Sequence, residues 1–125
     1  MSKKRILMVD DEKGITVMTK LNLERTGLYE VAVENRPTNA LATARKFNPD
    51  MIILDITMPE MDGPEVAEQI RADERLRNTP IVFLTAVVSR FETGDKQLER
   101  GGQVFLSKPV SQKALLECIE QHTKN

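Results

Sequence analysis

Histidine and cysteine are nearly absent from this chain of 125 residues, and their scarcity removes several classes of functional site. The single cysteine, Cys118, excludes an internal disulfide and a cysteine-based zinc site, and it favours a reducing, cytoplasmic location. The single histidine, His122, excludes a metal site built from several imidazoles. It falls on a predicted helical stripe near the C-terminus, which is more typical of a partly exposed helix residue than of a catalyst. Any chemistry must come from carboxylates, hydroxyls and amines.

The chain also lacks a large excess of charge of one sign, and it lacks long hydrophobic runs. The formal net charge is −1, so no basic field is available to hold nucleic acid. The apolar runs "MIIL" (51–54) and "IVFL" (81–84) are far too short to span a bilayer. The glycine-rich motifs G-x-x-x-x-G-K-[ST] and G-x-G-x-x-G do not occur, which leaves a P-loop or dinucleotide site without support. We therefore expect no direct nucleic-acid partner and no membrane.

Strand and helix patterns alternate along the chain. Strand patterns occupy residues 5–9, 29–34, 51–54, 81–84 and 101–106, the last of which opens with a turn. Helix patterns occupy residues 12–26, 37–47, 63–73, 88–100 and 111–122. Five strands alternating with five helices predict an α/β, doubly wound fold in which helices cover both faces of a parallel sheet. A chain of this length fits one domain.

Helical spacing supports most of these helices. In the helix over residues 12–26, Ile15, Met18 and Leu21 lie along one face. Ser111 is the expected N-cap of the last helix. The helix over residues 88–100 has Gly94 in its interior, and glycine disfavours a helix there.

Polar residues stand where the predicted strands end. Asp10 and Asp11 follow the first strand, Asp55 the third, Thr85 the fourth, and Lys108 the fifth. Each has an ordinary explanation taken alone: Asp11 suits a helix N-cap, and a strand-end lysine is usually solvated. Together they would converge on one edge, because the carboxyl ends of parallel strands lie at the same edge of the sheet. Ligands in such sheets bind just beyond these strand ends.

Three carboxylates, a hydroxyl and an ammonium at one edge suit phosphoryl chemistry. Two like charges about 4 Å apart at an effective dielectric near 20 cost roughly 4 kcal/mol, and Mg²⁺ would offset that repulsion between Asp10 and Asp11. Asp55, on a central apolar strand, is the candidate nucleophile for an aspartyl phosphate. Thr85 and Lys108 could contact the phosphoryl oxygens.

Four stretches carry a family resemblance: "VDDE" (9–12), "ILDITMPEMDG" (53–63), "FLTA" (83–86) and "FLSKP" (105–109). With these motifs the chain resembles the receiver domain of bacterial two-component response regulators, from about Lys4 to Thr123. The resemblance implies a flavodoxin-like, five-stranded sheet in the order 2-1-3-4-5. It also implies a stand-alone receiver domain over residues 1–125, because no output domain follows.

The resemblance implies a switch controlled by phosphorylation. A sensor histidine kinase or a phosphotransfer protein would give its phosphoryl group to Asp55 in a reaction that needs Mg²⁺, with Mn²⁺ as an alternative ion. Asp11, Asp55 and the backbone carbonyl of Thr57 would bind the ion, and Asp10 would help through water. Such a domain is not an enzyme in the usual sense, since it catalyses only its own phosphorylation and dephosphorylation.

The output is also implied by the resemblance. Thr85 and Lys108 would contact the phosphoryl oxygens, Phe105 would be the switch aromatic, and the Lys108–Pro109 bond would be cis. The surface of the fourth helix, fifth strand and fifth helix would then change for an unknown downstream protein. Family members often dimerise through their last helices when phosphorylated, so a phosphorylation-dependent homodimer is a further expected partner.

Two other classes of protein compete with this interpretation. A haloacid-dehalogenase-type phosphatase would need an Asp-x-Asp motif near its first strand, whereas here Asp10 and Asp11 are adjacent and the candidate nucleophile lies on the third strand. A pseudo-receiver or flavin-binding module would use only the fold. The acidic "DDEKGI" loop (10–15) would repel a flavin phosphate, and a degenerate receiver would have lost Asp55, Thr85 or Lys108.

Overall fold

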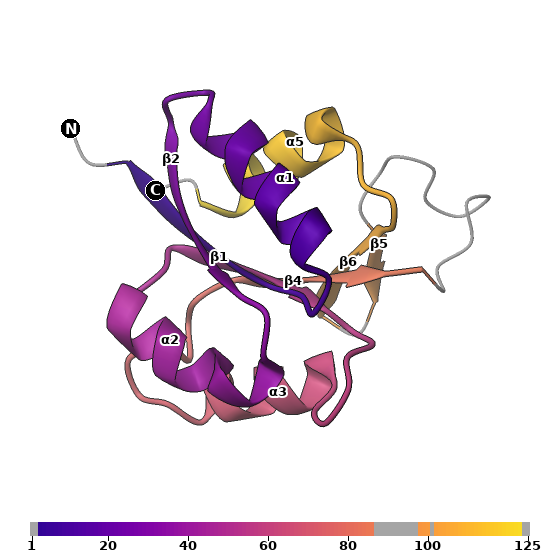
Figure 1. Ribbon diagram of the computed structural model, residues 1–125. Coiled ribbons are helices and arrows are strands. Elements are labelled where there is room, and N and C mark those ends of the chain that lie inside the picture. The colour runs from indigo at the N-terminus through magenta and orange to yellow at the C-terminus, as the bar shows by residue number, and fades with distance from the viewer. Residues whose placement is uncertain (1–2, 87–97, 101, 124–125) are drawn as a thin grey trace.

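A twisted sheet runs through the centre of the molecule, with helices on both faces (Figure 1). The computed structural model describes residues 3–86, 98–100 and 102–123. Its strands are β1 (Lys4–Val9), β2 (Tyr29–Glu34), β3 (Met51–Asp55), β4 (Ile81–Thr85), β5 (Leu98–Arg100) and β6 (Gln103–Ser107). They lie in the order β2-β1-β3-β4-β6-β5. The predicted parallel sheet in the order 2-1-3-4-5 is confirmed, with β6 as its fifth strand.

The predicted helix over residues 88–100 is wrong at its C-terminal end. Residues 98–100 form β5, which pairs antiparallel with β6 through Leu98↔Phe105 and Arg100↔Gln103. Gly102 adopts the left-handed backbone (φ 77°) that glycine accepts most readily, and this lets the chain reverse between the two strands. The rest of that predicted helix, residues 88–97, lies outside the described residues.

Four α-helices and one 3₁₀ helix surround the sheet within the described part of the chain. They are α1 (Lys13–Glu24), η1 (Pro37–Asn39), α2 (Ala40–Phe47), α3 (Gly63–Arg71) and α5 (Gln112–His122). Helices α1 and α5 cover one face, and α2 and α3 cover the other (Figure 1). Ser111 caps α5 as predicted, since its Oγ accepts a hydrogen bond from the Ala114 N–H at 3.1 Å. Over residues 3–86, 98–100 and 102–123, no helix has the length and apolar character needed to cross a membrane.

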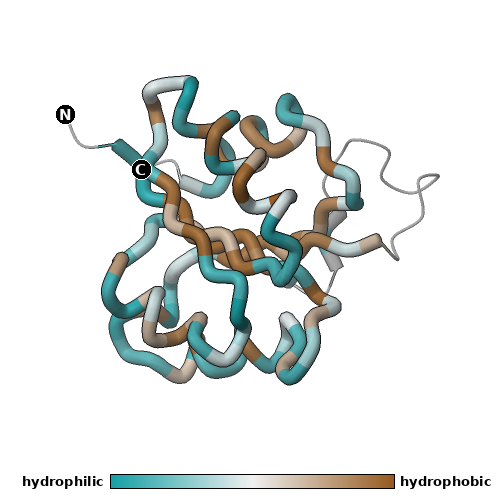
Figure 2. Tube along the Cα trace, in the orientation of Figure 1, coloured by the Kyte–Doolittle hydropathy of each residue, from teal (hydrophilic) through white to brown (hydrophobic). Residues whose placement is uncertain are grey.

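The sheet separates two apolar cores. On β1, Ile6 and Met8 pack toward one face while Leu7 and Val9 pack toward the other, because successive side chains of a strand point to opposite sides. Figure 2 shows the hydrophobic residues concentrated along the central strands. Burial on both faces explains why β1, β3 and β4 read as continuous apolar runs in the sequence.

The apolar stripe predicted on α1 faces solvent. Ile15, Met18 and Leu21 are 36%, 57% and 51% exposed, whereas Thr16 and Leu23 form the buried side of the helix. Their spacing correctly placed these three residues on one face of a helix, but that face does not pack against the sheet. The exposed side chains belong to the helix that begins two residues after Asp11.

Candidate metal and phosphoacceptor site

The polar strand ends meet at the carboxyl edge of the sheet. Asp55 is the last residue of β3 and Thr85 the last of β4, while Asp10 and Lys108 each follow directly on a strand. Asp55 pairs with Leu84, and Thr85 with Ser107, so the ends of β3, β4 and β6 lie level. Backbone bonding continues beyond the strands, since the Lys108 N–H donates to the Thr85 carbonyl at 2.9 Å.

Three carboxylates form the centre of the site. Asp10, Asp11 and Asp55 each offer an oxygen, and these atoms lie within 4.8 Å of one another. Asp10 is completely buried and Asp55 is 4% exposed, while Asp11 is more open. The adjacent aspartates of the first loop therefore share one small volume with the aspartate of β3, as their positions in the sequence predicted.

Lys108 is the cation that faces these carboxylates. Its Nζ lies 3.1 Å from Asp10 Oδ2, 3.1 Å from Asp55 Oδ1 and 3.2 Å from Glu12 Oε1. Sequence reasoning missed Glu12 as a member of this group, although it lies within the "VDDE" motif. Four carboxylates and one ammonium leave the described site with an excess of negative charge.

The pKa values of two groups reflect this arrangement. Burial raises the pKa of the Asp55 carboxyl above its ordinary value; the nearby Lys108 ammonium opposes the rise, and the charges of Asp10 and Asp11 add to it. Burial alone would lower the pKa of Lys108, but attraction to the Asp10 and Asp55 carboxylates, each 3.1 Å from its Nζ, raises it overall. The Lys108 charge thus only partly offsets the cost of burying the charged Asp55 carboxylate, while Lys108 itself stays charged at neutral pH.

The residues present fit a divalent cation. Asp10 Oδ1 accepts a hydrogen bond from the Glu12 N–H at 3.0 Å. The buried Asp10 Oδ2 lies at ion-pair distance from Lys108 but accepts no hydrogen bond from the described residues. A buried carboxylate oxygen with unused lone pairs, next to two further carboxylates, is the hard oxygen environment that Mg²⁺ takes. Asp11 and Asp55 would bind the ion, with Asp10 within reach through water.

The loop between β1 and α1 is held by Asn35, which sequence reasoning also missed. Its Nδ2 donates to the Asp10 carbonyl at 2.8 Å and to Thr16 Oγ1 at 3.0 Å. The alternative reading of Asp11 as a helix cap is wrong, because Glu12 occupies the N-cap position of α1 and makes no side-chain cap bond. The Asp11 side chain therefore does not occupy the N-cap position of α1.

The loop after β3 closes tightly on the end of that strand. The Gly63 N–H donates to the Ile56 carbonyl at 2.8 Å. Asp62 and Glu65 form a reciprocal capping box at the start of α3, with bonds of 2.9 and 3.1 Å. Thr57 lies exposed in this loop, two residues after Asp55, and the role of its carbonyl as a metal ligand stays a prediction. Gly63 was not singled out from the sequence, although "DG" before a helix is a turn signal.

Phe105 is half-buried on β6. Its ring stacks on that of Phe83, with 5.5 Å between centroids and 26° between planes, and it packs against the core that includes Leu54 and Val66. Thr85, on the neighbouring strand β4, is buried. The Lys108–Pro109 peptide bond is cis.

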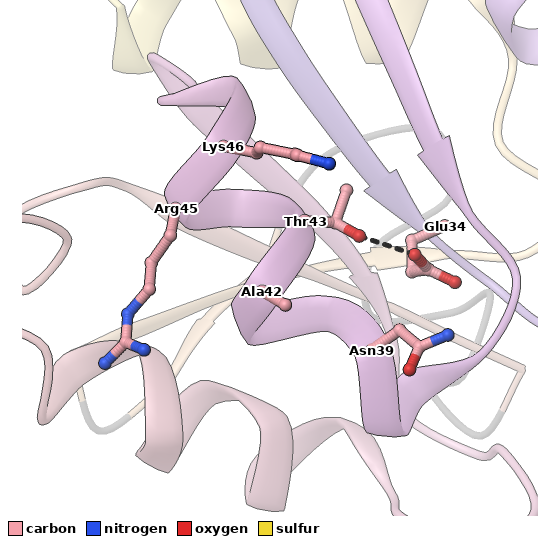
Figure 3. A pocket seen from close by; sticks show the side chains of 6 residues that line it. All are labelled: Glu34, Asn39, Ala42, Thr43, Arg45 and Lys46. Carbon is pink, nitrogen blue, oxygen red and sulfur yellow. Dashed lines mark hydrogen bonds between the residues drawn. The ribbon is translucent and has the colours of Figure 1, made fainter.

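A separate surface pocket of about 450 Å³ lies beside β2 and α2 (Figure 3). It is lined by Glu34, Asn39, Ala42, Thr43, Arg45 and Lys46. Thr43 Oγ1 donates to Glu34 Oε1 at 2.6 Å, as the figure shows, while the Arg45 side chain pairs with Asp73. None of the site carboxylates lines this pocket, so it is distinct from the candidate site.

Curated proteins similar to this chain are response regulators. PhoP of Bacillus subtilis, an alkaline phosphatase synthesis transcriptional regulatory protein, is 40% identical over 86% of this chain and 43% of its own length. The chain thus spans less than half of PhoP. The polar-differentiation response regulator DivK of Brucella ovis is 31% identical over 98% of this chain and 97% of its own length.

Solved structures agree with the sequence relatives. The chemotaxis protein CheY4 of Vibrio cholerae matches with a TM-score of 0.81 and 32% identity, covering 96% of this chain and 98% of that one. The receiver domain of the sensor histidine kinase PA1611 of Pseudomonas aeruginosa, which has a magnesium ion coordinated in its active site cleft, matches with a TM-score of 0.79 and 26% identity over 98% of both chains. The family model for the response regulator receiver domain covers residues 6–120. This chain belongs to the response regulator receiver domain family.

Proposed function

We propose that this chain is a signalling switch in which Asp55 accepts a phosphoryl group in a Mg²⁺-dependent reaction. The observation that carries the proposal is the position of Asp55, a buried carboxylate 3.1 Å from the Lys108 ammonium and within 4.8 Å of Asp10 and Asp11. Membership of the receiver family supports a role in phosphorylation-controlled signalling. The magnesium ion in the cleft of the PA1611 receiver domain supports the choice of metal, and Mn²⁺ is the alternative.

The chemistry needs one nucleophile and several groups that stabilise charge. An Asp55 oxygen attacks phosphorus, the P–N bond of a phosphohistidine breaks, and the imidazole leaves with the bonding electrons and takes up a proton. Lys108 Nζ and the Thr85 hydroxyl contact the phosphoryl oxygens of the product. Mg²⁺, when bound by Asp11, Asp55 and the Thr57 carbonyl, supplies positive charge that offsets the charge of the transferring group.

The donor is a protein in this proposal. Receiver domains interact with histidine kinases or phosphotransfer proteins. Ile15, Met18 and Leu21 form an exposed apolar stripe on the helix that begins beside Asp11, so a protein that presents phosphohistidine to Asp55 can bury them as it docks. A downstream protein partner, a homodimer formed on phosphorylation, a cytoplasmic location and the domain limits of 1–125 stay predictions.

Incubation with acetyl phosphate and Mg²⁺ tests the proposal. We expect the intact protein to gain the mass of one phosphoryl group, and hydroxylamine to remove it, as it does from an acyl phosphate. Asp55→Asn, which nearly keeps the shape of the side chain, should gain none. The control Asp73→Asn, a carboxylate paired with Arg45 after α3, should behave as the parent does. Uptake by Asp55→Asn at the parent's rate would refute the assignment, and steady phosphate release from many organophosphates would favour the phosphatase alternative.

Phe105 is the proposed route of the signal from the site. Its ring is half-buried before phosphorylation, so it has apolar area still to bury. A Thr85 hydroxyl that moves toward the phosphoryl group gains a charge-assisted hydrogen bond and vacates space beside β4. Rotation of the ring into this space would contribute about 1–3 kcal/mol, enough to shift a two-state equilibrium about five- to 150-fold.

Beryllofluoride, a mimic of the phosphoryl group, provides the measurement for Phe105. We expect the ring to become fully buried in the beryllofluoride complex. Phe105→Ala should still be phosphorylated on Asp55 but should no longer couple phosphorylation to partner binding or dimerisation. A ring equally exposed with and without the mimic would contradict this route and assign the signal to another element.

A further inference from the structure

Glu12 lies in the site without having the role that its position in the chain suggests. It is the N-cap residue of α1, yet its side chain makes no cap bond. Instead it reaches across 96 positions of sequence to Lys108, where Oε1 accepts a hydrogen bond from Nζ at 3.2 Å. The Glu12 side chain is 58% exposed, while the Lys108 side chain is 16% exposed. A carboxylate at the mouth of the site thus holds the ammonium inside it.

The three carboxylate partners of Lys108 differ in how easily they can be exchanged. An ammonium carries three N–H donors, and here its partners are the buried Asp10 and Asp55 and the exposed Glu12. Asp10 is fixed by the Glu12 N–H and by its place at the end of β1. Glu12 alone among the three can turn into water at little cost, because its carboxylate is then hydrated rather than buried unpaired.

Phosphorylation changes what Lys108 has to bind. Once Asp55 carries a phosphoryl group, its own carboxylate charge is replaced by the charge of the phosphoryl oxygens, which lie farther from the strand end. Lys108 must turn a donor toward them, and Glu12 is the group that holds a donor on the open side of the site.

We propose that Glu12 is a positioning residue that competes with the phosphoryl group for Lys108, so that the Glu12–Lys108 contact opposes the phosphorylated state. This inference rests on the proposed function of Asp55. Exposed ion pairs contribute about 0.2–1 kcal/mol. This pair belongs to the upper part of that range, because the Lys108 side chain is only 16% exposed, so removing it should strengthen binding of a phosphoryl mimic about two- to fivefold.

Binding of beryllofluoride at saturating Mg²⁺, followed by ¹⁹F NMR, tests the inference. Glu12→Gln removes the charge and keeps the length, and we expect two- to fivefold tighter binding than in the parent. Glu12→Asp keeps the charge but is one methylene too short to keep the 3.2 Å contact, so it should also bind more tightly than the parent. Glu74→Gln, an exposed carboxylate in the turn after α3, should match the parent.

Ionic strength separates a competing ion pair from a structural effect. The difference between Glu12→Gln and the parent should narrow as salt rises from about 0.05 to about 0.5 M, because an exposed ion pair is screened. Equal affinities in Glu12→Gln and the parent would overturn the inference. A Glu12→Asp variant with the same affinity for beryllofluoride as the parent would overturn it too. The difference seen in Glu12→Gln would then depend on the charge at this position and not on the contact with Lys108. Absence of beryllofluoride binding in the parent would instead overturn the proposed function, and this inference with it.

Discussion

Replacing Gly63 with alanine is expected to destabilise the protein by about 3 kcal/mol, near the upper end of what overpacking usually costs. A Cβ at this position would lie 2.5 Å from the Asp55 carbonyl oxygen and 2.9 Å from the Ile56 Cα. Both atoms belong to the backbone, so no side chain can rotate away to make room. The first residue of α3 would have to move off the end of β3, and the Gly63–Ile56 hydrogen bond would break.

Gly14 provides a matched control for Gly63. It lies in the first turn of α1, and a Cβ there would meet no atom within 4 Å. Gly14→Ala should therefore stabilise the protein by about 0.5 kcal/mol, through the lower conformational entropy of the unfolded chain. Urea unfolding of both variants measures the two effects, which have opposite signs. A Gly63→Ala variant as stable as the parent would show that α3 can shift without cost.

The sheet and the three central aspartates could be predicted because burial leaves a direct trace in the sequence. β1, β3 and β4 are covered on both faces, so each reads as an uninterrupted apolar run, and the first polar residue after the run marks the strand end. Parallel strands place all such ends at one edge. This is how Asp10 and Asp55, which are 45 positions apart in the sequence, could be assigned to one site before any distance was known.

The hairpin at the far edge could not be predicted in the same way. β5 spans only Leu98–Arg100, too few residues to show an alternation, and it is held by backbone pairing with β6. α1 shows a different limit. The spacing of Ile15, Met18 and Leu21 says that they share a helix face but not that this face is covered, and here it is exposed.

Contacts that depend on side-chain reach were also missed. Glu12 adjoins two aspartates, and its sequence position suggests a helix cap as readily as a partner for Lys108. Gly63 shows the converse, because the sequence contains a glycine but not the carbonyl that approaches it. Predicting either contact requires the distance between residues that are not neighbours in the sequence. A local sequence pattern does not contain that distance.

Lys108→Met is expected to lower the free energy of unfolding by about 3 kcal/mol at neutral pH without Mg²⁺. Removing one partner of a buried ion pair usually costs 3–5 kcal/mol, because the other charge is left buried and unpaired. Here Asp10 is completely buried and Asp55 nearly so, and both lie 3.1 Å from the ammonium that is lost. The lower end of that range applies because the Lys108 side chain itself is 16% exposed. Lys13→Met, an exposed lysine in the first turn of α1, should change stability by less than about 0.5 kcal/mol.

The pH dependence of the Lys108→Met defect follows from Asp55. Burial already raises the pKa of this carboxyl in the folded protein, and Lys108 opposes that rise, so its loss raises the pKa further. An acid whose pKa is higher folded than unfolded adds stability at pH values below its unfolded pKa, and this stability is lost as the pH rises through the folded value. The defect should therefore be small in acid and grow toward neutral pH. Mg²⁺ at about 100 times its Kd stabilises a protein that binds it by about 2.7 kcal/mol, and it should narrow the defect because the variant lacks the ammonium beside Asp10 and Asp55 that repels the ion in the parent. Thermal and urea unfolding across pH, with and without Mg²⁺, measure both effects, and a defect that neither acid nor Mg²⁺ reduces would show that lost packing, not unpaired charge, is its cause.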